Sequence, residues 1–127
     1  MGAPIIYLDN YNLWVSNGVK DYFCDVIFEG AKMRKIDISK IHEEDSTIGF
    51  YGVSGLGIAV EDFFPHFSGK KGFLQHLEYC KKNIEQICDN ETASKSMFNI
   101  LCWVEYMING GEFEDNINFC ELLPPEN

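Results

Sequence analysis

Residues 12–29 read NLWVSNGVKDYFCDVIFE, and the Asn17-Gly18 pair inside this stretch decides the predicted fold. Asn-Gly tolerates the positive φ values of a two-residue type I′ turn, which joins two antiparallel strands. Beyond the pair, apolar residues recur at every second position, as in a strand with one buried face. Four residues would form that face: Tyr22, Cys24, Val26 and Phe28. The stretch therefore predicts a β-hairpin.

Shorter apolar runs extend the strand pattern towards residue 64. They occupy residues 33–38, 48–53 and 56–60, and Ser54-Gly55 suggests a second hairpin between the last two runs. Glycines within these runs would weaken the strands and mark bulges or close backbone approach. We expect a sheet of four to six antiparallel strands from about residues 3–64.

After Pro65 the apolar period becomes that of a helix. Residues 69–89 carry one apolar stripe, and Ser68 is the expected N-cap. A second helix, capped by Asn90 or Thr92, would run to Ile108 and end at a left-handed glycine in the pair at 110–111. Its short connection to the first helix predicts an antiparallel helical hairpin.

The expected fold class is α+β, with an antiparallel β-sheet from the N-terminal half packed by a C-terminal two-helix antiparallel hairpin. A half-closed barrel with the same helices is the alternative. The length of 127 residues fits a single domain at 1–127. That domain would be strand-rich at about 3–64 and helical at about 69–110, with an acidic tail at 111–127.

The charge of the chain is strongly negative and unevenly distributed. The formal net charge is −10, and residues 83–127 hold nine acids against a single base, Lys95. The negative electrostatic field of such a chain attracts cationic partners and repels nucleic acid and anionic lipid. We therefore expect neither nucleic acid nor a membrane as a partner. Solubility alone is the competing explanation, since a charge run is usually a solvated face.

Neither an N-terminal signal pattern nor an apolar run long enough to span a membrane is present, which favours a cytoplasmic protein. The five cysteines are odd in number and include no C-x-x-C pair. Such a set is typical of reduced thiols that behave as small buried hydrophobes.

Two groups of residues are candidates for chemistry. His76 and Cys80 stand four apart on the first helix and could bind zinc, but structural zinc needs four ligands. We therefore expect no metal and no cofactor. Glu61, Asp62 and His66 could serve acid-base chemistry, and Cys80 beside Lys81 is the least unfavourable nucleophile. The neighbouring phenylalanines are expected in the core, with a partner-facing aromatic patch as the alternative.

The chain is small and acidic, lacks a catalytic motif, and has the run GLGIAVEDFF at residues 55–64 ahead of two expected helices. In these features it resembles the small acidic immunity proteins that protect bacteria against contact-dependent growth inhibition toxins. The resemblance implies an antitoxin that binds and neutralises a basic toxin. A nuclease fits best, because carboxylates can occupy the positions of the substrate phosphates.

The predicted partner-binding residues are carboxylates from two parts of the chain. Several of them alternate with apolar residues, as in surfaces that dock on basic proteins. They are Glu105, Glu112, Glu114, Asp115 and Glu121, with Glu43, Glu44 and Asp45 as a second cluster. The alternative functions are a small enzyme that uses the residues named above and an adaptor in a larger assembly, and the oligomeric state stays open.

Overall fold

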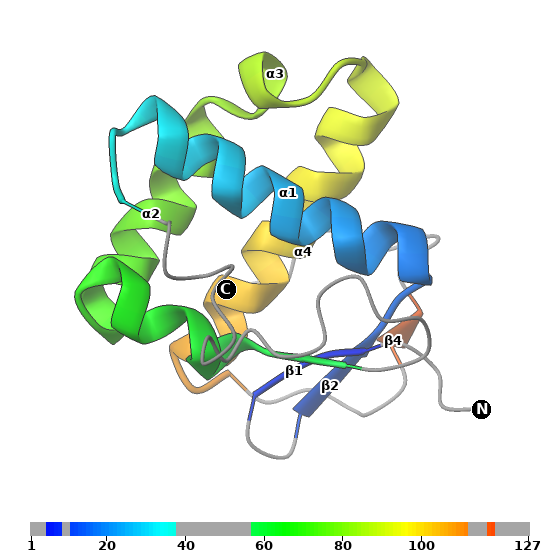
Figure 1. Ribbon diagram of the computed structural model, residues 1–127. Helices are drawn as coiled ribbons and strands as arrows, with labels where there is room; N and C mark the ends of the chain where they lie inside the picture. The colour runs from blue at the N-terminus through cyan, green and yellow to red at the C-terminus, as the bar shows by residue number, and fades with distance from the viewer. Residues whose placement is uncertain (1–4, 9–10, 38–56, 112–116, 119–127) are drawn as a thin grey trace.

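The computed structural model describes residues 5–8, 11–37, 57–111 and 117–118. These ranges are mostly helical, with one small mixed sheet at one side of the helices (Figure 1). In chain order the elements are β1 (Ile5–Leu8), β2 (Tyr11–Trp14), α1 (Asn17–Met33), β3 (Ile58–Ala59), the 3-10 helix η2 (Val60–Phe67), α2 (Lys70–Lys82), α3 (Ile84–Ile87), α4 (Glu91–Ile108) and β4 (Ile117–Asn118).

The predicted fold class is wrong, because the long second strand of the expected hairpin is the helix α1. Ser16 is its N-cap, and the Ser16 side-chain oxygen accepts a hydrogen bond from the Val19 amide at 3.1 Å. The Asn17-Gly18 pair therefore lies in the first turn of a helix and makes no hairpin. Adjacent residues such as Phe23 and Cys24 are both buried, which alternation in a strand does not allow.

The sheet is mixed and short, which also differs from the prediction. Its strand order is β3-β1-β2-β4, and only β1 and β2 pair antiparallel, with Ile5 opposite Trp14. The edge strands β3 and β4 have two residues each and run parallel to their neighbours. Of the other predicted strands, residues 33–38 begin inside α1, and the hairpin around Ser54-Gly55 lies outside the described residues.

The helices of the C-terminal half were predicted more accurately. α4 begins at the expected cap, where the Asn90 side chain accepts a hydrogen bond from the Ala93 amide at 2.8 Å, and Gly110 follows it with a φ of +84°. α2 begins after Gly69, however, and Ser68 is instead the left-handed residue that ends η2. The predicted two-helix hairpin is also wrong, because α2 ends at Lys82 and the short helix α3 follows before α4. Among the described helices, none has both the length and the apolar composition to cross a bilayer.

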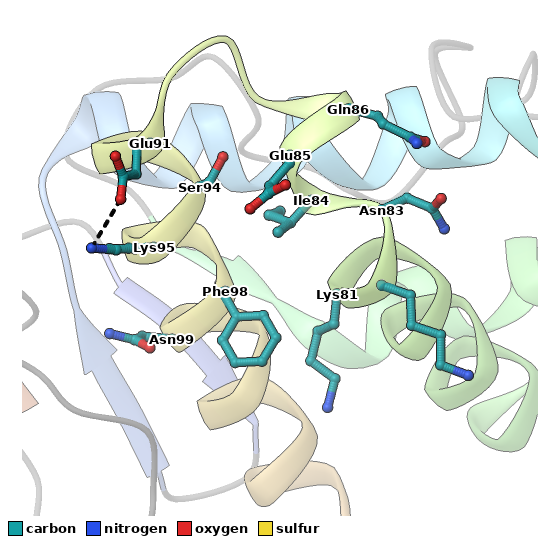
Figure 2. A pocket seen from close by; sticks show the side chains of 11 residues that line it. Lys81, Asn83, Ile84, Glu85, Gln86, Glu91, Ser94, Lys95, Phe98 and Asn99 are labelled. Carbon is teal, nitrogen blue, oxygen red and sulfur yellow. Dashed lines mark ion pairs between the residues drawn. The ribbon is translucent and has the colours of Figure 1, made fainter.

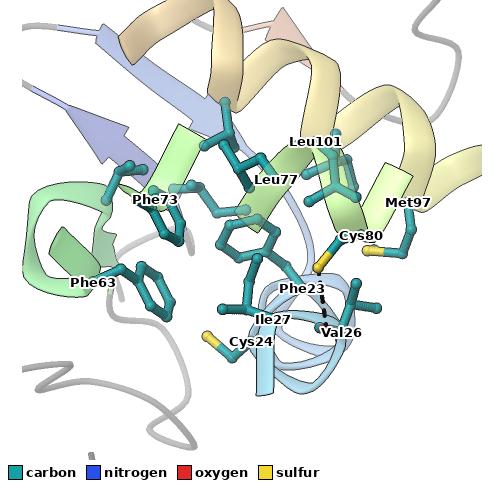
Figure 3. Packing of buried hydrophobic residues seen from close by; sticks show 14 of the residues in the cluster. Phe23, Cys24, Val26, Ile27, Phe63, Phe73, Leu77, Cys80, Met97 and Leu101 are labelled. Carbon is teal, nitrogen blue, oxygen red and sulfur yellow. Dashed lines mark hydrogen bonds between the residues drawn. The ribbon is translucent and has the colours of Figure 1, made fainter. Parts of the chain in front are cut away.

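The core lies between α1, η2, α2 and α4, as Figure 3 shows. The ring of Phe63 stacks on that of Phe73 with centroids 5.2 Å apart, and it meets Phe23 of α1 edge-on at 5.9 Å. Phe67 is also buried, so the prediction that this aromatic run packs into the core is confirmed. These rings join α1 to α2, so α2 packs against α1 as well as α4.

Replacing Gly18 with alanine distinguishes the helix from the hairpin. Gly18 has no positive φ, and an added Cβ would meet only the Ser16 Oγ, at 4.0 Å. Gly18→Ala should therefore stabilise the protein by about 0.5–1 kcal/mol in urea unfolding, because alanine has the higher helix propensity and restricts the unfolded chain. A type I′ turn requires a positive φ at this position, so destabilisation would contradict the helix.

Candidate functional site

One of the predicted partner-binding carboxylates, Glu105, lies within the described residues, and it belongs to an ion-pair network. Lys81 Nζ of α2 lies 2.9 Å from Glu105 Oε2 of α4 and 2.7 Å from Glu78 Oε1. The contact to Glu105 is an ion pair and not a well-angled hydrogen bond, since Oε2 has no hydrogen-bond partner of its own. The Lys81 side chain is only 13% exposed.

This network compensates the charge of Glu105. Burial raises the pKa of the Glu105 carboxyl above its usual range, and the pairing with Lys81 opposes that rise. The hydrogen bond from Lys81 lowers the pKa of the more exposed Glu78. Glu105 therefore acts as a link between α2 and α4 in this structure, and its contact with a partner stays a prediction.

Lys81 also lines a cleft that the sequence did not predict. This α2–α4 cleft has a volume of about 710 Å³ and is bounded by the end of α2, α3 and the first half of α4 (Figure 2). Phe98 lies in it and is 36% exposed. Lys95, Phe98 and Cys102 form a stripe on the helix face next to that of the buried Met97 and Leu101.

The other predicted partner-binding residues lie outside the described residues. The structure therefore neither brings them together nor separates them. They are Glu43, Glu44, Asp45, Glu112, Glu114, Asp115 and Glu121. The described β4 lies within four positions of Glu114, Asp115 and Glu121 along the sequence and pairs with β2 through Leu13 and Trp14.

The charge surplus divides between the two parts of the chain in an informative way. The described residues contain eleven acids and nine bases, whereas the rest of the sequence contains nine acids and only one base. The described helices and strands are therefore nearly neutral as a group. The feature that predicts a cationic partner belongs almost entirely to residues 38–56 and the segments that flank β4.

His76, the first member of the candidate zinc pair, is fully buried between two partners with fixed roles. His76 Nδ1 lies 3.0 Å from Arg34 Nη1, and Nε2 lies 2.9 Å from the carbonyl oxygen of Ile27. A guanidinium only donates and a carbonyl only accepts, so Nδ1 accepts while Nε2 donates. The neutral tautomer with its proton on Nε2 is the one form that satisfies both contacts.

The pKa of His76 agrees with this assignment. Burial lowers it from 6.5 to about 4, the positive charge of Arg34 lowers it too, and the hydrogen bond to Ile27 opposes the change. The ring also stacks on Phe67, with centroids 4.3 Å apart. His76 is therefore a neutral structural residue that fastens α2 to α1.

Cys80 lies in the same contact and is a poor nucleophile. Its Sγ lies 3.6 Å from His76 Nε2 and 3.9 Å from the Val26 carbonyl oxygen, inside the core. Burial raises the pKa of the Cys80 thiol to about 12, although Arg34 lowers it, and burial also raises the pKa of Cys24 and Cys102. Thiolate chemistry requires the opposite shift.

The remaining candidates for chemistry lie on η2. Glu61 is exposed, while Asp62 and His66 are half-buried and stand four positions apart. Burial and the neighbouring charge of Glu61 raise the pKa of Asp62, and His66 lowers it. Within the part of the chain that the structure describes, no three His, Cys, Asp or Glu side chains gather as metal ligands do.

Comparison with known proteins gives no relative: no family model, no curated protein and no solved structure matches the chain.

The close approach of α1 and α2 depends on the absence of a side chain at Gly30. A Cβ added there would lie 2.5 Å from Cys80 Sγ and 3.3 Å from His76 Cε1. Gly30→Ala should therefore destabilise the protein by about 1–3 kcal/mol in urea unfolding, because the core has no room for the methyl group.

Two variants separate this steric effect from helix propensity. Gly18→Ala is the same substitution in the same helix and should have the opposite sign. In the double variant Gly30→Ala/Cys80→Ala the sulfur is gone, so the loss should be smaller than the sum of the single losses by about 1 kcal/mol. Strict additivity would show that the two helices do not meet at this point.

The buried neutral His76 predicts a specific dependence of stability on pH. Its pKa is lower in the folded chain than in the unfolded chain, so the unfolded state binds the proton as the pH falls from about 6.5 to 4. The free energy of unfolding should fall in this pH range by up to about 1.4 kcal/mol per pH unit. His76→Gln keeps a donor and an acceptor without titrating, so its free energy of unfolding should change less steeply with pH. A slope in His76→Gln as steep as that of the wild type would contradict the assignment.

Proposed function

We propose that this chain is an immunity-type binding protein that neutralises a basic toxin, and that this toxin is a nuclease. The carrying observation is the position of the charge surplus. Residues 112–127 contain five acids and no base. A surplus needed only for solubility has no reason to be concentrated in this way.

Binding would rest on carboxylates that alternate with apolar residues. In residues 112–121 the acids Glu112, Glu114 and Asp115 interleave with Phe113 and Phe119. Carboxylates would steer a cationic protein during the encounter, and the aromatic residues would supply the desolvated contacts that hold it. On a nuclease, the same carboxylates would cover the cationic groove that receives nucleic acid phosphates.

The thiols favour binding over catalysis. The pKa of each of Cys24, Cys80 and Cys102 is raised by burial, which opposes a covalent mechanism. Four of the cysteines are free thiols within the described residues, as is usual in the reducing cytoplasm, where we place the protein.

Charge reversal with a matched control tests the proposal. The probe is the purified basic domain of the secreted protein that we expect to be encoded directly upstream. Glu112→Lys/Glu114→Lys should weaken its binding at least about thirtyfold, chiefly through slower association, and raised salt should weaken the wild-type complex. Asp25→Lys/Glu29→Lys makes the same charge change on exposed positions of α1 and should bind nearly as the wild type does.

Co-expression gives the biological readout of the same variants. Cells that produce the basic domain should survive with the wild-type chain or with the α1 control, and should stop growing with Glu112→Lys/Glu114→Lys. Binding that ignores both salt and this charge reversal would contradict the electrostatic mechanism. A metabolic gene in the upstream position would contradict the immunity assignment.

A further inference from the structure

A small hollow at the turn between α3 and α4 contains carboxylates and no base. This α3–α4 hollow has a volume of about 300 Å³ and is lined by Glu85, Cys88, Asp89, Asn90, Glu91 and Ser94. It adjoins the α2–α4 cleft, because Glu85, Glu91 and Ser94 line both. The result is one continuous depression with an anionic end.

The carboxylates of the hollow are not held by strong pairs. Glu85 is exposed and forms no ion pair with any residue in the described ranges. Glu91 reaches Lys95 at 3.3 Å, but both side chains are more than three quarters exposed, at 83% and 76%. Such an exposed pair is weak and can exchange its cation for another.

Ser94 supplies an independent indication of a ligand. The residue is only 6% exposed, yet it lines both depressions, and its hydroxyl makes no hydrogen bond with the residues that the structure describes. Figure 2 shows Ser94 on α4 facing the gap towards Glu85 on α3. A serine hydroxyl at the wall of the hollow that makes no hydrogen bond with the described residues can accept one from a bound group.

The apolar part of the cleft lies next to this anionic end. In Figure 2, Phe98 lies below Ile84 and Glu85, between α4 and Lys81 of α2. Three bases line the wall of the cleft, namely Lys81, Lys82 and Lys95. Lys81 pairs with Glu78 and Glu105, Lys95 pairs weakly with Glu91, and Lys82 forms no ion pair with the described residues. A ligand that fits both parts has an alkyl stem or flat face for Phe98 and a cationic head for the carboxylates.

We propose that the α3–α4 hollow binds the guanidinium of an arginine from the basic partner, with the arginine stem lying over Ile84 and Phe98. Arginine fits better than lysine, because its planar guanidinium offers five donors to separate acceptors and stacks on an aromatic face. Glu85 and Asp89 accept through their carboxylates, Ser94 accepts through its hydroxyl, and Glu91 exchanges Lys95 for the arginine. This inference rests on the proposed function, since it names one contact of that complex.

The direct test uses the full chain and a small probe. N-acetyl-arginine amide is titrated into the ¹⁵N-labelled protein and compared with N-acetyl-citrulline amide, which has a similar shape without the charge. Saturable amide shifts at Glu85, Asp89, Ser94 and Phe98 are expected with arginine, and binding of citrulline should be at least about tenfold weaker. Equal shifts with both probes, or arginine shifts spread evenly over the chain, would overturn the inference.

Variants connect the probe to the complex. Glu85→Gln/Asp89→Asn should abolish the local arginine shifts and weaken binding of the basic domain about tenfold. Asp25→Asn/Glu29→Gln, with the same charge change on α1, should do neither. If the basic domain binds through residues 112–114 while Glu85→Gln/Asp89→Asn changes nothing, the hollow is excluded and the proposed function remains. If no basic protein binds at all, the proposed function fails whatever the arginine titration shows.

Discussion

The contact between α1 and α2 through a neutral histidine is the constraint on which the rest of the described structure depends. His76 can satisfy Arg34 and the Ile27 carbonyl at once only when its proton is on Nε2. The contact requires Gly30 on the facing turn of α1, because any Cβ there would meet Cys80. Around this point the phenylalanines of η2 and α2 fill the space beside α1. The hydrogen bonds of His76 therefore hold α1 and α2 at a short distance, and the apolar side chains pack around this contact.

Charge in this protein has two separate roles. Within the described residues, the Lys81–Glu105 ion pair joins α2 to α4. The excess of carboxylates lies elsewhere in the sequence, beside β4 and in residues 38–56. We propose that this excess serves the recognition of a basic partner. The α3–α4 hollow is the one exception that we identify within the described residues, since its acids have no strong internal partner.

Elements with local sequence signals were predicted correctly. The prediction of α1 was wrong because two local signals, the Asn-Gly pair and the alternation of apolar residues, both favour a hairpin. α4 was predicted with its cap because its signals are local in the sequence: Asn90 marks the start, the apolar stripe marks the buried face, and Gly110 marks the end of the helix. α1 was missed because Asn-Gly suits a turn and also fits the first turn of a helix behind a capping serine. Asp21, Asp25 and Glu29 share a face at either period, so they could not decide between strand and helix. The unbroken apolar run at residues 26–28 departs from strict alternation, and the structure buries all three side chains in α1.

Contacts between distant residues could not be predicted at all. Glu105 looked like an exposed carboxylate because nothing local reveals that Lys81 lies against it. The candidate zinc pair was correctly placed on one helix face, but only the structure shows that this face meets α1.

The tautomer of His76 is the most direct test of the account. A long-range ¹H–¹⁵N correlation spectrum of the labelled protein at neutral pH separates a protonated ring nitrogen from an unprotonated one. The account predicts a proton on Nε2, an unprotonated Nδ1, and no change until the pH falls well below the usual histidine range. A proton on Nδ1, or an imidazolium at neutral pH, would contradict it, because neither form can accept the hydrogen bond from Arg34.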